Sequence, residues 1–186
     1  MNDPLQITLA DAVEFLERHF IEYALVGGLA VSLRGQTRVT ADVDMVIAID
    51  LDRALQLVDE LEDSKFTPLF AGVAEVVQKS FILPIRHRET GIRVDLAIGL
   101  SGFERQAIQR ANMIEVGGCP TAVATAEDLV IMKVLAGRPQ DEQDLIGLVA
   151  TQSSSFDWDY CILVARQLGD VLGQDLAKRV IILRDD

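Results

Sequence analysis

Asp42 and Asp44 stand one residue apart in the segment "ADVDMVIAID", where apolar side chains recur at every second position. This alternation predicts a β-strand, in which residues two apart project from the same face, about 6.5 to 7 Å from each other. Two carboxylates brought together in a partly buried site bind protons unless a cation compensates their charge. Mg²⁺ or Mn²⁺ suits ligands that are all oxygen atoms. The pair is therefore a candidate metal site.

A third carboxylate, Asp95, is the only acid in the apolar segment "IRVDLAIG". If this second strand lies beside the first, about 4.8 Å away, the three carboxylates share one face of a sheet. They can then bridge two metal ions about 3.5 to 4 Å apart, which polarise a phosphoryl group and assist an attacking oxygen. We expect Asp42, Asp44 and Asp95 to be metal ligands and catalytic residues of such a displacement.

A glycine pair, Gly27 and Gly28, ends the short apolar segment "YALV" and leads directly into the helical segment "LAVSLRG". Glycines at the start of a helix leave backbone N–H groups accessible at its positive end, which suits a triphosphate. A glycine pair alone is more often a simple tight turn. Its combination with the DxD strand and a later strand aspartate favours a nucleotide site.

Two elements with clear end signals flank these strands. The segment "TLADAVEFLERHF" carries apolar residues on one helical face, and Thr8 can cap its start. Asp50 can cap a helix over 51–64, whose leucines and Val58 form a core-facing stripe. A further helix candidate follows in "GVAEVVQKS".

The segment "FILPIRHRETGIRVDLAIG" predicts two strands joined by a turn at 89–91. Pro84 has no N–H to donate, which places the first of these strands at a sheet edge or a bulge. A helix capped by Ser101 follows, and "MIEVGGCPTAVA" is predicted to be extended.

The remainder of the chain reads as helices. "AEDLVIMKVLAG" ends at Gly137, the next helix has Pro139 in its first turn, and two amphipathic helices follow the weak linker "TQSSS". We expect an α/β (α+β) fold: a small mixed sheet that carries the GG and DxD motifs, flanked by helices, with a helical C-terminal part. The expected division is a core over 1–123 and a helical extension over 124–186, packed together as one compact unit.

Composition limits the function classes. With 186 residues, 49% of them hydrophobic, the chain can bury one sizeable core. Its 29 acidic and 17 basic side chains give a formal charge of −12. Such a charge repels phosphate backbones, which disfavours broad nucleic-acid binding and favours a small ligand or a protein partner.

Cellular context is also suggested by the sequence. Cys119 and Cys161 stand alone, with no CxxC spacing, as expected of reduced thiols rather than of zinc ligands or a disulfide. The acidic N-terminal segment does not resemble a signal peptide, and no apolar run approaches the ~18 residues of a membrane span. We expect a cytoplasmic protein with no membrane partner.

These motifs resemble those of the DNA polymerase beta-type nucleotidyltransferase superfamily, whose pattern is hG[GS], a short helix, Dh[DE]h and a later strand carboxylate. The string "GGLAVSLRGQTRVTADVD" is similar in particular to small bacterial nucleotidyltransferases of the abortive-infection toxin type. Their downstream helix "EDLhhhKhhAGRxxD" matches Glu127 to Asp141. The resemblance spans about Val26 to Leu148.

The resemblance implies a role for several matching residues. Gly27 and Gly28 would approach the nucleotide phosphates, with Gly28 in place of the serine of many members. The three aspartates would hold the metal ions, and Asp95 would also act as the base for the acceptor. Lys133 would offer its ammonium to the triphosphate. The same downstream motif includes Arg138, Asp141 and Asp144, to which no definite role is carried over.

Other polar residues have competing interpretations. Arg38 and Thr40 share the parity of the DxD aspartates and are candidates for nucleotide binding, although a surface role for Arg38 is about as plausible. Lys133 interrupts an apolar helix, so its charge either reaches water or meets an anion. His87 lies between two arginines and could bind an acceptor phosphate, but a solvated turn is the favoured interpretation.

The leading functional hypothesis is a nucleotidyltransferase that moves a nucleoside monophosphate from an NTP to an acceptor with Mg²⁺ and releases pyrophosphate. The acceptor, whether a small molecule such as an aminoglycoside, a tRNA end or a protein side chain, is left open. The alternative is a non-catalytic module of the same fold that acts as an antitoxin or regulatory partner, within a toxin–antitoxin pair. A dinucleotide-binding domain is excluded because the GxGxxG motif is absent.

Overall fold

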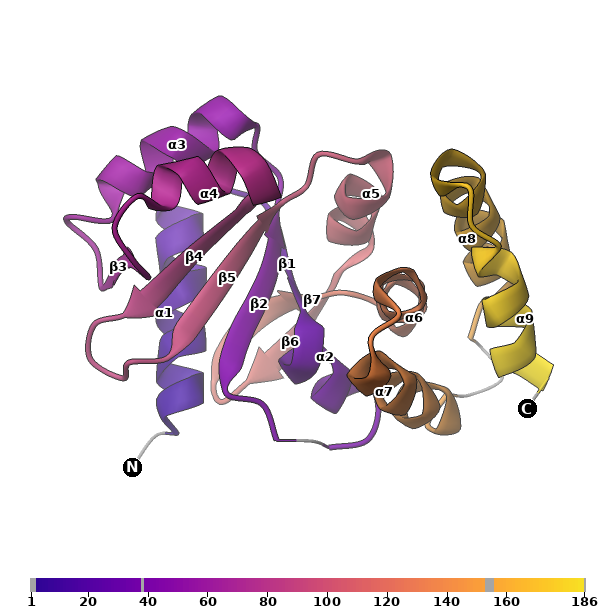
Figure 1. Cartoon of the computed structure of the whole chain (residues 1–186). Coiled ribbons are helices and arrows are strands. Elements are labelled where there is room, and N and C mark those ends of the chain that lie inside the picture. Colours follow the sequence, from indigo (N-terminus) through magenta and orange to yellow (C-terminus); the bar gives the residue numbers. More distant parts are fainter. Residues whose placement is uncertain (1–2, 38, 153–155, 186) are drawn as a thin grey trace. The chain divides into compact units, whose positions relative to one another are not determined.

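The computed structural model describes residues 3–37, 39–152 and 156–185 (Figure 1). The chain divides into two compact units, one formed by Met1–Leu29 and Val39–Val123 and the other by Ala30–Arg38 and Ala124–Asp186. The sequence analysis places residues 30–38 in the core, whereas this division assigns them to the unit of the C-terminal helices. Helix α2 (Gly27–Arg34) therefore begins in the first unit and ends in the second.

A mixed sheet forms the first unit (Figure 1). Within the described residues its strand order is β3-β4-β5-β2-β1-β7-β6. β2 pairs with β5 in parallel and with β1 antiparallel, and β1 pairs with β7 in parallel. The expectation of an α/β fold with a mixed sheet is confirmed. The strands are β1 (Tyr23–Val26), β2 (Asp42–Ile47), β3 (Phe66–Pro68), β4 (Ile82–His87), β5 (Arg93–Ile98), β6 (Asn112–Val116) and β7 (Cys119–Val123).

The helices of this unit pack on the sheet. Helix α1 contacts β2, and α5 contacts β1 and β2, while α4 contacts both α3 and β4. Asp50 and Ser101 cap α3 and α5 as the sequence predicts, each accepting a backbone N–H bond. The helices are α1 (Pro4–Arg18), α3 (Leu51–Glu60), α4 (Val73–Ser80) and α5 (Gly102–Arg110).

The first helix starts earlier than the sequence indicates. Asp3 caps it by accepting the N–H of Leu5, and Pro4 occupies the first turn, where its missing N–H is not needed. Thr8 is therefore not the cap. It is fully buried within α1, and its hydroxyl donates to the carbonyl of Pro4 at 2.9 Å.

Burial explains the register of β2. Val43, Met45 and Ile47 are all fully buried, whereas Asp42 and Asp44 on the opposite face are partly exposed. Burying one such apolar side chain stabilises the fold by about 1.5 to 3 kcal/mol. A shift by one residue would turn Val43 and Met45 toward the partly exposed part of the other face and bury both carboxylates. The alternation seen in the sequence therefore determines which face carries the acids.

The place of one strand in the sheet differs from the sequence expectation. The short strand β3 pairs with β4, so the strand that contains Pro84 is not at an edge of the sheet. The pairing of β3 with β4 ends at Pro68, which lies opposite Ile85, and Pro84 has no partner residue in β3. No hydrogen bond between these two strands therefore needs the N–H that Pro84 lacks. The segment after α5 is extended, as expected, and forms a hairpin of β6 and β7.

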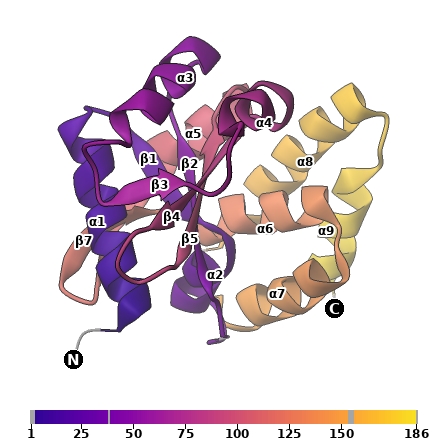
Figure 2. The ribbon, with the colours of Figure 1, turned by 60° about the vertical axis from the view of Figure 1, so that its left-hand side comes forward.

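The second unit consists of helices, as expected for the C-terminal part (Figure 2). Besides the end of α2 it contains α6 (Ala126–Ala136), α7 (Pro139–Ala150), α8 (Trp158–Leu172) and α9 (Leu176–Asp185). Helix α6 contacts each of the other three. Gly137 ends α6 in the left-handed conformation, and Pro139 opens α7, both as predicted.

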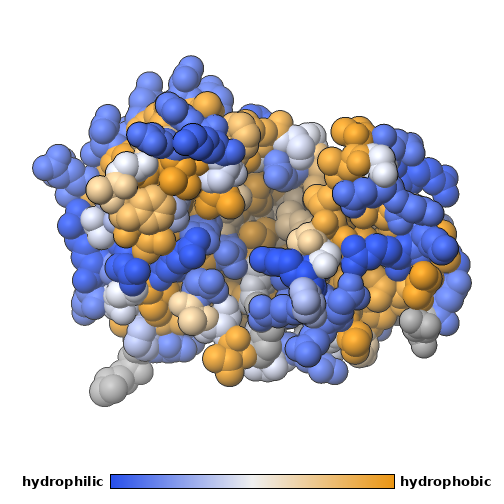
Figure 3. Space-filling view, in the orientation of Figure 1, coloured by the Kyte–Doolittle hydropathy of each residue, from blue (hydrophilic) through white to orange (hydrophobic). Residues whose placement is uncertain are grey.

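The surface shows mixed polarity. Hydrophobic side chains lie among hydrophilic ones on the face drawn in Figure 3. Within the described ranges, none of the helices has both the length and the apolar character needed to cross a bilayer. Residues 153–155 of the expected "TQSSS" linker lie outside the described part of the chain.

Candidate active site

The three predicted carboxylates belong to neighbouring strands of the first unit. β2 and β5 run in parallel, with Asp44 level with Asp95 and Asp42 level with Arg93. Residues that pair in register project from the same face, and so do residues two apart on one strand. The condition stated for a shared face, that the Asp95 strand lies beside the DxD strand, is met. Asp42, Asp44, Arg93 and Asp95 thus form a four-residue patch on one face of the sheet.

The patch is partly shielded from water. Asp42 and Asp44 are of intermediate burial, and the side chain of Asp95 is 19% exposed. Thr40 donates its hydroxyl to Asp42 Oδ1 at 3.0 Å, so this side chain orients one of the carboxylates. Arg38, the other candidate on this segment, lies outside the described residues.

Gly27 lies directly against Asp44. It starts α2 with a φ of +64°, and a Cβ added to it would lie 1.9 Å from Asp44 Oδ2 and 2.6 Å from Asp44 Cβ. Only glycine tolerates both this backbone conformation and this approach. The first glycine of the pair therefore does more than end a strand, because it makes room for a carboxylate of the patch.

A cation that the sequence reasoning did not single out completes the patch. Arg93 Nε donates to Asp95 Oδ1 at 2.7 Å. This bond raises the pKa of the Arg93 guanidinium, and the charges of Asp42 and Asp44 raise it further. A signal was present in the sequence, because Arg93 has the same strand parity as Asp95 in "IRVD".

The patch suits a divalent metal in donor chemistry and alignment. All of its candidate ligands are carboxylate oxygens, and the absence of a side chain at Gly27 makes room for that of Asp44. In the part of the chain that the structure describes, however, no three acidic, histidine or cysteine side chains converge closely enough to hold an ion. One oxygen of Asp95 is instead bonded to Arg93. Asp42, Asp44 and Asp95 would hold the metal once their side chains converge.

Lys133 lies in the second unit and contacts protein anions. Its ammonium is 2.9 Å from Asp141 Oδ1 and 2.7 Å from Asp144 Oδ2, and all three residues are buried. Burial raises the pKa of Asp141, but hydrogen bonds from Arg138 and Lys133 outweigh it and hold that pKa well below its usual range. The charge in this apolar helix thus meets carboxylates of α7, which favours a structural role for Lys133.

The interpretation of His87 as part of a solvated turn is wrong. The residue is 1% exposed, and its Nε2 lies 2.8 Å from Asp11 Oδ2 on α1. Its Nδ1 accepts the backbone N–H of Thr90, so the proton on Nε2 is donated to Asp11. The imidazole therefore connects the β4–β5 hairpin to α1. Its apolar surroundings include Phe66, whose ring contacts it edge-on.

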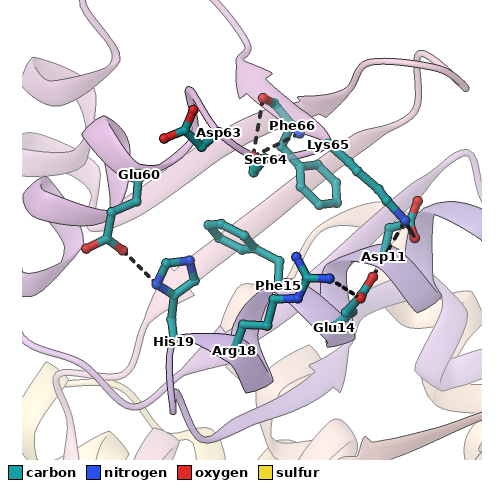
Figure 4. Close-up of a pocket in the computed structure, with 10 residues that line it drawn as sticks. All are labelled: Asp11, Glu14, Phe15, Arg18, His19, Glu60, Asp63, Ser64, Lys65 and Phe66. Atoms are coloured by element: carbon teal, nitrogen blue, oxygen red, sulfur yellow. Dashed lines mark hydrogen bonds and ion pairs between the residues drawn. The ribbon is translucent and has the colours of Figure 1, made fainter.

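A cavity of about 510 Å³ opens elsewhere in the first unit, between α1 and the segment that leads into β3 (Figure 4). Its charged groups compensate one another: Lys65 bonds Asp11, and His19 bonds Glu60. None of the predicted site residues lines it. The lining residues are Asp11, Glu14, Phe15, Arg18, His19, Glu60, Asp63, Ser64, Lys65 and Phe66.

Comparison with protein families gives one match over most of the chain. The profile of the family described as "Nucleotidyltransferase of unknown function (DUF6036)" matches residues 7–161. This range contains the glycine pair, the DxD strand and Asp95. It also contains the ion pairs of Lys133 on α6 with Asp141 and Asp144 on α7. No curated protein matches the sequence significantly.

Solved structures share the fold. An antigenic nucleotidyltransferase-like protein from Paracoccidioides brasiliensis superposes with a TM-score of 0.59 at 20% identity, covering 94% of this chain and 92% of that one. The solution structure of the antibiotic-resistance factor ANT(2'')-Ia gives 0.51 at 15% identity, with 97% and 89% covered. Its complex with adenylyl-2''-tobramycin gives 0.50 at 14% identity, with 97% and 94% covered. The chain therefore has a nucleotidyltransferase fold.

Proposed function

The chain belongs to this nucleotidyltransferase family, and we propose that it transfers a nucleoside monophosphate from an NTP to an acceptor hydroxyl or phosphate and releases pyrophosphate, with Mg²⁺ or Mn²⁺ as cofactor. The observation that carries the proposal is the in-register pairing of Asp44 with Asp95, with Asp42 two residues along β2. Three carboxylates on one partly shielded sheet face repel one another and favour the binding of a cation. A divalent metal would supply that positive charge.

In the proposed reaction the acceptor oxygen attacks the α-phosphorus of the NTP, and the bond from that phosphorus to the bridging oxygen of pyrophosphate breaks. The metal supplies charge neutralisation and polarisation of the phosphoryl group. Asp42 and Asp44 would hold it, and the Thr40 hydroxyl fixes the orientation of Asp42. Asp95 would complete the ligand set and accept the proton of the acceptor hydroxyl.

The start of α2 is the proposed phosphate site. The helix begins at Gly27, immediately after β1, so its first backbone N–H groups and the positive end of its dipole lie next to Asp44. Gly28 contributes a backbone donor only, since it has no hydroxyl. The roles of Arg38 and Lys133 in nucleotide binding stay predictions, and the paired ammonium of Lys133 supports the structural alternative.

The test uses labelled NTPs, Mg²⁺ and a cell extract as the source of acceptor, with the modified product identified by mass spectrometry. Removing a metal ligand forfeits several kcal/mol of transition-state stabilisation. At about 1.4 kcal/mol per factor of ten, we expect Asp44→Asn to reduce transfer at least about a hundredfold. Asp52→Asn is the matched control, because this aspartate is exposed in the first turn of α3, away from the patch.

Two outcomes would overturn the assignment of the carboxylates. One is transfer that persists undiminished in Asp42→Asn or Asp44→Asn. The other is an equal loss in Asp52→Asn, which would indicate a general effect of lost charge rather than a lost ligand. The identity of the modified product distinguishes a small molecule, a tRNA end and a protein side chain as acceptor.

A second candidate function is a non-catalytic module with the same fold, acting as an antitoxin or regulatory partner. The observation in its favour is the Arg93–Asp95 bond, which already compensates one of the three carboxylates within the protein. Calorimetry separates the two functions. A stoichiometric partner protein together with no metal-dependent NTP binding would support this module and exclude the enzyme. The resemblance to abortive-infection toxin-type proteins stays a prediction.

A further inference from the structure

Arg93 is the one cation of the four-residue patch, and nothing in the proposed reaction uses it. It stands level with Asp42 across the β2–β5 ladder and two residues before Asp95, so it faces the same side of the sheet as all three carboxylates. The patch therefore has three negative groups and one positive group. A divalent metal would bring a second source of positive charge to the same oxygens.

The Arg93 guanidinium is bonded to an atom that a metal needs. Its Nε lies 2.7 Å from Asp95 Oδ1, and its side chain is 47% exposed while that of Asp95 is 19% exposed. A carboxylate offers about four lone pairs, so this bond takes up part of its capacity and places a positive charge beside the position that a metal ion would take. In the residues that the structure describes, no three acidic, histidine or cysteine side chains converge to hold an ion. An ion that binds Asp95 therefore has to overcome the charge and the hydrogen bond of Arg93.

We propose that Arg93 is a positioning residue that competes with the divalent cation for Asp95. The proposal rests on the proposed function, because it takes Asp95 as a metal ligand. Without metal, Arg93 holds Asp95 and offsets the repulsion among the three carboxylates. When metal binds, the guanidinium releases Asp95 and moves toward the water to which it is already half exposed. Arg93 thus sets the metal concentration at which the site becomes loaded.

The size of the competition follows from the exposure of the pair. An ion pair between exposed groups changes the equilibrium constant of the process that breaks it by up to about fivefold. The effect is larger when the carboxylate is more buried, as Asp95 is. We therefore expect Arg93→Gln to bind Mn²⁺ about five to ten times more tightly than the unchanged protein. A structural role would give the opposite sign, because a disordered Asp95 would weaken metal binding.

Arg86 is a matched control. It stands opposite Arg93 in the β4–β5 ladder, is exposed, and donates to the carbonyl of Gly91 at 2.8 Å rather than to a carboxylate. Arg86→Gln removes the same charge from the same region of the sheet. Arg93→Lys keeps a charge at the original position and should restore an affinity close to that of the unchanged protein.

The experiment titrates Mn²⁺ into the full chain without nucleotide and follows free Mn²⁺ by electron paramagnetic resonance. Tighter binding in Arg93→Gln, with Arg86→Gln within about twofold of the unchanged protein, supports the competition. Equal affinity in the two glutamine variants, or weaker binding in Arg93→Gln, would overturn it. Asp95→Asn separates this failure from that of the proposed function, because Mn²⁺ binding that does not depend on Asp95 in any variant overturns both.

Discussion

The contact between Gly27 and Asp44 allows a quantitative prediction for Gly27→Ala. Two effects add in this variant. The first is the left-handed backbone at a φ of +64°, which destabilises a residue with a Cβ by about 1 to 2 kcal/mol. The second is steric: the new methyl would lie 2.6 Å from Asp44 Cβ, an atom fixed to β2, so the strand or the start of α2 must shift. Overpacking of this kind destabilises by about 1 to 3 kcal/mol.

Gly91→Ala separates the two effects. Gly91 also has a positive φ, +72°, but a Cβ there would meet nothing within 4 Å. Its substitution therefore includes no steric effect. It measures the cost of the left-handed backbone and the entropy that alanine removes from the unfolded chain. We expect urea denaturation to show a loss of about 2 to 5 kcal/mol for Gly27→Ala and of about 1 to 2 kcal/mol for Gly91→Ala.

The same pair of variants tests the site. Because Asp44 must move in Gly27→Ala, we expect metal binding and nucleotide transfer to fall in this variant and to persist in Gly91→Ala. Equal destabilisation by the two substitutions would refute the reasoning, since it would mean that the approach of Gly27 to Asp44 carries no steric energy. A variant that is destabilised but still transfers at the original rate would show that Asp44 is not needed for the reaction.

Two further predictions concern buried ion pairs. Lys133→Met leaves Asp141 and Asp144 without their shared ammonium. We expect urea denaturation to show that the free energy of unfolding falls by about 3 to 5 kcal/mol. A loss below about 1 kcal/mol would contradict the stabilising role of these ion pairs. The pKa of Asp141 and that of Asp11 both lie below the usual value of an aspartate, because in each case burial, which raises the pKa, is outweighed by hydrogen bonds from neighbouring side chains. Carboxylates with lowered pKa stabilise the fold above their unfolded-state pKa, and this stability is lost as the pH falls through the folded-state value. The urea concentration at the unfolding midpoint should therefore decline as the pH falls below about 4. The decline should be weaker in Asp141→Asn than in the unchanged protein. Identical pH dependences of the two proteins would contradict the role of Asp141.

Local sequence signals predicted much of the secondary structure because each is set by nearby residues. The caps Asp50 and Ser101 and the helix end at Gly137 are formed by residues within one turn of the element they bound. The first helix shows the limit of this reasoning: the sequence indicated Thr8 as the cap, whereas Asp3 caps the helix and Pro4 occupies its first turn. The edge strand β3 was missed because three residues are too few to show an alternation.

Burial of individual polar residues could not be derived from the sequence. His87 lies between two arginines in the chain, yet it is buried, and Asp11, far away in sequence, accepts a hydrogen bond from its Nε2. Lys133 was expected to meet an anion, but only the packing of α6 against α7 shows that Asp141 and Asp144 are those anions. Both outcomes depend on long-range contacts that periodicity does not encode.

The sequence by itself determined that Asp42 and Asp44 share one face of a strand, because side chains alternate along any extended chain and the apolar residues claim the other face. It also indicated that Asp95 belongs to a second strand of the same kind. Only the tertiary structure decided that these strands are parallel neighbours, with Asp44 level with Asp95 and Arg93 level with Asp42. The physical reason is that pairing and register follow from the packing of the whole sheet, whereas alternation is a property of each strand alone.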